Sequence, residues 1–112
     1  KRPFAFVLKG QAFSGTETWH DVYIQVCVCL AKQNRDTFEK VLTEKTFLSS
    51  HGRKYFSRDV ADLRMPGKVI DDIYAECNLS ANDLAKEMRV LLGVYDINIK
   101  DMIIYLREDR NA

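Results

Sequence analysis

The chain has 112 residues, of which 46% are hydrophobic and 29% are charged, so its composition is that of one ordinary globular domain and not of a disordered chain. Because 17 Lys and Arg residues face 16 Asp and Glu residues, the net charge is +1 and exerts no global attraction on nucleic acid or on an acidic membrane surface. We therefore expect a single compact domain over residues 1–112 that recognises its partners through local surfaces.

The cysteine content and the hydropathy indicate where such a domain works. The three cysteines, Cys27, Cys29 and Cys77, form neither an even set nor a framework spacing, which argues against a secreted disulfide scaffold. No apolar run reaches the roughly 18 residues of a membrane span, and no signal peptide is visible. We expect a cytoplasmic protein with reduced thiols and no membrane contact. Because the first residue is Lys and not Met, we expect a trimmed chain or a piece of a longer protein.

A β-hairpin is expected at the start of the chain. Every second residue of the first stretch is apolar and would share one face: Phe4, Phe6 and Leu8. Lys9 and Gly10 follow where a tight turn is needed, and Gly adopts positive φ angles at little cost. A second strand is therefore predicted at about 11–14.

Two amphipathic helices are expected next. The first has apolar residues at intervals of three and four: Trp19, Val22, Tyr23, Val26 and Leu30. Thr18 and Asp21 have the spacing of a capping box at its start, although the many β-branched residues leave a strand as the alternative. A second, shorter helix is expected within 35–45, with Asp36 as its cap and Glu39 three residues later. Its inward residues would be Phe38, Val41 and Leu42.

The middle of the chain is less regular. A loop is expected around His51 and Gly52, followed by a short extended piece at 54–57 and one helical turn at 58–64. The stretch MPGK (65–68) is predicted to be a turn, because Pro fixes φ and Gly takes the left-handed position.

A strand, a helix and a closing strand are expected in the last third of the chain. The strand is predicted at about 73–77, and Ser80 is the expected cap of the helix, with Asp83 completing an acidic capping box. Gly93 is expected to end this helix. Its apolar face would consist of Ala81, Leu84, Ala85, Met88, Leu91 and Leu92. The closing strand is predicted at 102–107.

The predicted order of elements is β-β-α-α-(β)-β-α-β. Because strands and helices do not alternate regularly, this order indicates the α+β fold class. We expect a small, mostly antiparallel sheet with the helices packed on one face.

A basic and aromatic stretch at 53–68, called the basic segment below, is the candidate functional surface. Its five cations outnumber Asp59 and Asp62 by three, and Tyr55 and Phe56 lie between the cations. Positive charge binds phosphate and exposed rings stack on bases, so we predict contact with nucleic acid, either DNA or RNA. The alternative is an ordinary solvated connection. The predicted contact residues are Arg53, Lys54, Tyr55, Arg58, Arg64 and Lys68.

Catalytic and metal-binding motifs are not evident. His20 and His51 have no Cys or carboxylate at ligand spacing, so we expect no cofactor and no metal. Asp71, Asp72 and Glu76 have a faint similarity to the carboxylates of a metal-dependent nuclease, but no E/D-x-K follows them on the strand. An enzyme is therefore the less favoured alternative.

A protein-interaction or oligomerisation module with no nucleic-acid role is the other alternative. Small sheets leave edge strands unpaired, and the first or the last predicted strand would be free to pair with another chain. A homodimer is the simplest product of such pairing.

Five stretches that together span nearly the whole chain resemble a small accessory domain found beside prokaryotic restriction, DNA-modification and phage-defence proteins. The stretches are PFAFVLKGQAF, TWHDVYIQVC, YFSRDVADLRMPGKV, IYAECNLSANDLAKEMRVLL and IYLRE. They share a pattern of apolar positions and turns and contain no catalytic motif. The resemblance implies a non-catalytic binding or assembly module of a prokaryotic or phage protein, touching nucleic acid or a protein partner.

Overall fold

The computed structural model describes residues 2–44, 47–49 and 51–108, so the other positions of the domain predicted over 1–112 lie outside the described residues. The strands and helices, in chain order, are β1 (Arg2–Leu8), β2 (Gln11–Ser14), α1 (Trp19–Gln33), α2 (Arg35–Glu39), β3 (Phe56–Ser57), β4 (Pro66–Ile70), β5 (Ile73–Glu76), α3 (Ala81–Val94) and β6 (Met102–Arg107). Short 3-10 turns lie between them, among them η1 (Lys40–Leu42), η3 (Val60–Asp62) and η4 (Ile99–Asp101).

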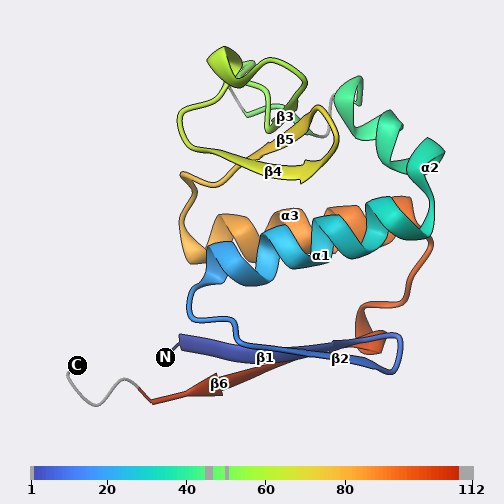
Figure 1. Cartoon of the computed structure of the whole chain (residues 1–112), viewed down its shortest axis with the longest axis vertical. Helices are drawn as coiled ribbons and strands as arrows, with labels where there is room; N and C mark the ends of the chain where they lie inside the picture. Colours follow the sequence, from blue (N-terminus) through green and yellow to red (C-terminus); the bar gives the residue numbers. More distant parts are fainter. Residues whose placement is uncertain (1, 45–46, 50, 109–112) are drawn as a thin grey trace.

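The strands form two antiparallel three-stranded sheets, in the orders β2-β1-β6 and β3-β5-β4. Helices α1 and α3 lie side by side between the two sheets (Figure 1). The predicted α+β class is confirmed, but the strands are divided between two sheets on opposite sides of the helix pair. The buried residues of α1 extend over half of its circumference, so one sheet alone would not cover them.

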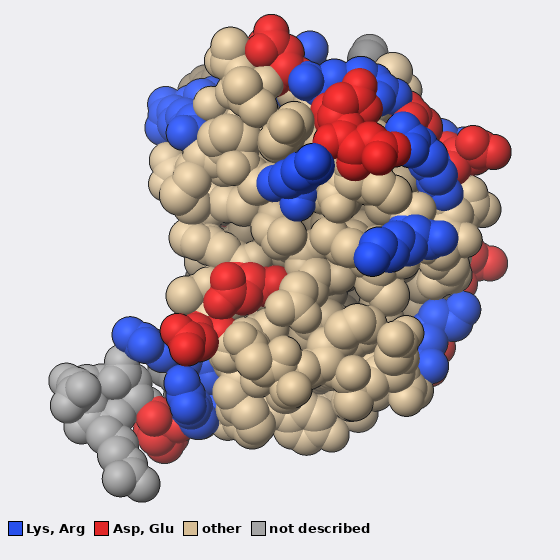
Figure 2. All heavy atoms as spheres, viewed as in Figure 1, with Lys and Arg blue, Asp and Glu red and all other residues tan. Residues whose placement is uncertain are grey.

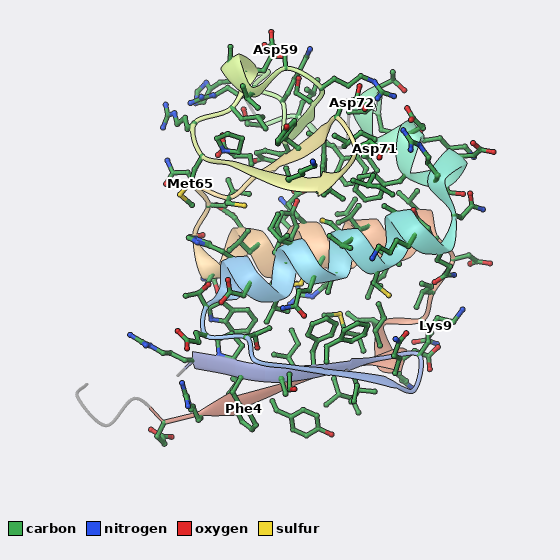
Figure 3. The ribbon with its side chains drawn as sticks, viewed as in Figure 1. Phe4, Lys9, Asp59, Met65, Asp71 and Asp72 are labelled. Atoms are coloured by element: carbon green, nitrogen blue, oxygen red, sulfur yellow. The ribbon has the colours of Figure 1, made fainter. Side chains whose placement is uncertain are left out.

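The predicted hairpin between β1 and β2 is confirmed. Lys9 (φ 50°) and Gly10 (φ 80°) are its turn residues, and positive φ at both positions gives the twist that suits a two-residue hairpin. The predicted shared face is wrong at its first residue. A register shift between Pro3 and Ala5 in the pairing with β6 turns Phe4 away from the helices (Figure 3), because a bulge interrupts the alternation of side chains.

The first helix begins as predicted, which excludes the alternative strand. Thr18 Oγ1 accepts from the backbone N–H of Asp21 (3.2 Å), and the Asp21 carboxylate accepts from the N–H of Thr18 (3.1 Å). The predicted cap of α2 is wrong: Asn34, not Asp36, accepts from the N–H of Thr37 (3.1 Å). Asn34 also ends α1 with an extended backbone, so one residue separates the two helices.

The predicted MPGK turn is wrong, because most of this stretch belongs to β4. The turn between β4 and β5 lies at Asp71 (φ 46°) and Asp72 instead. A Cβ atom on Gly67 would lie 2.6 Å from Ile24 Cδ1 and 2.7 Å from Cys77 Sγ. This glycine therefore allows β4 to approach α1 closely, which a count of turn-forming residues does not reveal.

The helix α3 begins at the predicted cap, where Ser80 Oγ accepts from the N–H of Asp83 (3.1 Å). Its predicted end is wrong: the helix continues through Gly93 to Val94, and the chain turns at Asp96, which has a φ of 55°. The buried residues of α3 are Leu84, Glu87, Met88, Leu91 and Leu92. The apolar face was thus predicted in part, and the buried acid was not.

The core between α1, α2 and the second sheet is aromatic. The ring centroid of Phe56 lies 5.4 Å from that of Phe47, 5.6 Å from that of Phe38 and 6.3 Å from that of Tyr23. One cluster of buried side chains continues from here through the helix pair to the first sheet. Within the described ranges, no helix is long and apolar enough to cross a membrane.

Candidate interaction surfaces

The cations of the basic segment lie among acidic side chains at one end of the molecule (Figure 2). Arg58 donates hydrogen bonds to Asp72 Oδ1 (2.6 Å) and to Glu39. Lys54 Nζ lies 3.4 Å from Asp62 Oδ2. Two of the five cations are therefore paired with carboxylates, and the net charge of +3 counted along the sequence does not form a continuous positive surface.

The other predicted contact residues differ in exposure. Tyr55 is half-buried against the core, and its backbone N–H donates to Phe47 O (3.0 Å). Arg53 is also half-buried, whereas Arg64 and Lys68 are exposed. Neither Arg64 nor Lys68 makes an ion pair with any residue that the structure describes. These two side chains are the part of the predicted site that remains available to phosphate.

The three carboxylates considered for a nuclease each have a separate partner. Asp71 accepts from Arg35, Asp72 accepts from Arg58, and Glu76 accepts from the backbone. The hydrogen bond from Arg58 holds the pKa of Asp72 below its usual value. In the described part of the chain, no three His, Cys, Asp or Glu side chains are grouped so that they could hold a metal ion. The geometry gives the nuclease alternative no support.

Glu76 connects β5 to the segment that precedes β4. Its Oε1 accepts from the N–H of Arg64 (2.8 Å), and its Oε2 accepts from the N–H groups of Met65 (2.9 Å) and Asn78 (3.1 Å). The residue is 5% exposed, and burial alone would raise its pKa, but the three donors outweigh burial and the pKa is lowered. This carboxylate therefore has a structural role.

A second buried carboxyl group belongs to α3. Glu87 is 5% exposed, and burial raises its pKa to about 7. Neither its Oε2 nor the hydroxyl of Tyr23 has a hydrogen-bond partner among the residues described. Burial raises the pKa of Tyr23 as well. Glu87 is thus neutral in acid, and its ionisation near neutral pH disfavours the folded state.

The cysteines are free thiols. Burial raises the pKa of Cys27 and of Cys29, and burial together with the charge of Glu76 raises the pKa of Cys77 to about 11. Protonated thiols are poor nucleophiles at neutral pH. Cys27 is completely buried in the core, and Cys77 is buried directly after the end of β5.

The sheet β2-β1-β6 has one bare face. No element of the described chain covers the side that faces away from α1 and α3 (Figure 1). Phe4 (41% exposed), Ile103 (50%) and Tyr105 (44%) lie on this side, and the ring centroids of Phe4 and Tyr105 are 6.3 Å apart. Much of this end of the molecule is uncharged in Figure 2, whereas charges crowd the opposite sheet.

Strand β6 is also an edge strand. It pairs with β1 on one side and, among the described residues, with nothing on the other. Its sequence is apolar at five consecutive positions, 102–106, before the charged Arg107. Such a run is typical of a strand with both faces covered, yet β6 has only one covered face. Charged residues and Pro protect edge strands from pairing, and the only such residue within β6 is Arg107 at its end.

An apolar groove of about 260 Å³ lies between β6 and α3. It is lined by Trp19, Ala85, Met88, Arg89, Leu92, Ile99, Met102 and Ile104. The groove beside the other edge strand, β2, is more polar, with Gln11, Gln25 and Lys32 among its lining residues. A strand added to β6 would place its inward side chains over this apolar groove.

No family model, curated protein or solved structure shows a significant match to this chain. The surfaces are therefore interpreted from their own geometry. The sequence favours the basic segment and leaves pairing of the first or the last strand as an alternative. The prediction of a free first strand is wrong, because β1 is the central strand of its sheet, whereas the last strand, β6, is an edge strand. The sequence does contain a signal for the β6 surface. Apolar and polar residues alternate in a half-buried strand, whereas β6 has an unbroken apolar run.

Proposed function

We propose that this chain is a protein-interaction domain that accepts an extended protein segment as an additional strand on the free edge of β6. The observation that carries the proposal is the unbroken apolar run of β6, which lies on an edge strand with a bare outer face. Main-chain hydrogen bonds along the edge would supply affinity, and the groove beside α3 would select the inward side chains.

Selection of strand-forming peptides tests this proposal. A display library of short extended peptides is selected on the wild-type chain and compared with the variant I103K. We expect enriched peptides with alternating apolar residues that bind I103K roughly tenfold more weakly or worse, because Lys on an edge strand opposes strand addition. Val60→Lys is the matched control, since Val60 is 47% exposed but belongs to η3 beside the other sheet. Peptides that bind both variants equally would reject the β6 site.

Nucleic-acid contact through the basic segment is the second candidate function. It is supported by Arg64 and Lys68, which are exposed and make no ion pair with described residues. Fluorescence anisotropy with labelled single-stranded and duplex oligonucleotides would show salt-sensitive binding. Removing both side chains in R64A/K68A is expected to lower the salt slope by about two, whereas Lys32→Ala on α1 leaves it unchanged. Absence of binding at low salt would exclude this candidate.

A cytoplasmic location is proposed together with these functions. Free Cys27, Cys29 and Cys77 support a reducing, cytoplasmic environment. A place beside restriction, DNA-modification or phage-defence proteins is what the resemblance implies. A strand-binding domain would serve there by holding a partner protein in an assembly.

A further inference from the structure

We infer that the segment taken up by β6 is β6 of a second copy of this chain, paired antiparallel about a two-fold axis to join the two sheets into one of six strands. This inference rests on the proposed function, because it requires β6 to accept a strand. The faces of β6 and the charges at its two ends favour a second copy as the partner.

The faces of β6 restrict the pairing register. Ile103 and Tyr105 lie on the outer face, whereas Met102 and Ile104 line the groove on the inner face. A slip by one residue would place outer side chains of one copy against inner side chains of the other. Only shifts by an even number of residues keep outer side chains beside outer ones and inner beside inner. Among these registers, the one that places Ile104 opposite Ile104 of the second copy centres the apolar run on the two-fold axis.

Charges at the two ends of the run select this same register. Asp101 directly precedes β6, and its carbonyl accepts from the N–H of Lys9 (2.9 Å) at the end of the β1–β6 ladder. With Ile104 on the axis, Asp101 lies opposite Arg107 of the second copy, and symmetry repeats this pair at the other end. Shifting the second copy by two residues places Asp101 opposite Tyr105, or Arg107 opposite Ile103 in the other direction. Both shifts lose the opposite-charge pairs and place a charge opposite an apolar side chain.

The pairing also covers exposed apolar side chains. Ile103 lies beside Tyr105 of the second copy on the outer face, and aromatic residues pair favourably with β-branched ones across strands. Phe4, which already contacts Tyr105 within one copy, extends this row. On the inner face, Leu106 (43% exposed) lies opposite Met102 of the second copy, next to the groove beside α3.

Sedimentation equilibrium of charge-reversal variants tests the register. The wild-type chain is expected to pass from 13.0 kDa to twice that mass as its concentration rises through the micromolar range. Either D101R or R107D should weaken self-association about tenfold, because each places like charges opposite one another at both ends. The double variant D101R/R107D restores opposite charges and should recover wild-type association. Lys68→Asp, on the other sheet, is the matched control and should have no effect.

The outcomes separate this inference from the function on which it rests. Circular dichroism confirms that each variant is folded, and recovery in the charge swap excludes misfolding as the cause of loss. The register is overturned if neither D101R nor R107D weakens self-association, or if the double variant D101R/R107D does not restore it. A chain that stays monomeric while selected peptides still bind β6 overturns the second copy as partner and leaves the strand-binding function intact. A monomer that selects no peptides overturns both.

Discussion

Replacing Glu76 by Ala is expected to lower the free energy of unfolding by about 3 kcal/mol, because three partly buried hydrogen bonds from backbone N–H groups lose their charged acceptor. The carboxylate accepts from the backbone of Arg64, Met65 and Asn78, which ties together the chain before β4 and the chain after β5. Urea denaturation followed by circular dichroism measures this loss. Glu76→Gln keeps one acceptor oxygen and should lose less.

The pH dependence of the free energy of unfolding tests the same hydrogen bonds of Glu76 independently. The pKa of Glu76 is lowered in the folded state, so its stabilisation is present above its ordinary pKa of 4.5 and is lost as the pH falls through the lower folded value. The stability difference between wild type and E76A should therefore shrink in acid. Asp72→Ala is the matched control, because an exposed ion pair contributes about 1 kcal/mol or less. Equal losses in E76A and D72A at neutral pH would contradict the structural role of Glu76.

Replacing Glu87 by Gln is expected to stabilise the fold by about 2–3 kcal/mol at pH 8. Burial raises the pKa of Glu87 from 4.5 to about 7, so its contribution to stability is fully present below pH 4.5 and is lost as the pH rises through 7. A difference of 2.5 pKa units corresponds to roughly 3 kcal/mol. Gln has a similar shape and no charge to bury, so the variant should lack this decline.

Thermal unfolding between pH 4 and pH 8 measures the effect, with a melting temperature for E87Q that stays flatter than that of wild type. Asp36→Asn removes an exposed carboxylate from α2 and should leave the decline in place. If E87Q loses stability with rising pH as steeply as the wild type does, Glu87 is not the group responsible.

The parts of the fold that were predictable are those specified by neighbouring residues. Lys9 and Gly10 specify a two-residue turn, and Thr18 or Ser80 caps a helix through an N–H three residues away. Interactions of this range are visible in a window of a few residues. The α+β class followed from the order of these elements.

The parts that were not predictable depend on contacts between distant segments. The residues around Gly67 predict a turn. Gly67 lies in a strand instead, and a side chain at this position would collide with Ile24 and Cys77. Phe4 leaves the inner face because of a register shift against β6, nearly the whole chain away. In the same way, the partners of Arg58 are 19 and 14 residues distant, so a local count of charge overestimated the positive surface.

Amide hydrogen exchange along β6 is the measurement that decides whether this edge is the interaction site. In the dilute chain, about half of the amides of β6 should exchange rapidly, because alternate N–H groups of an edge strand point away from its neighbour. With a selected peptide, or at high chain concentration, we expect these amides to become protected while β2, the other edge of the same sheet, is unchanged. Unchanged exchange in β6, with new protection in β2 or in the basic segment, would contradict the proposal.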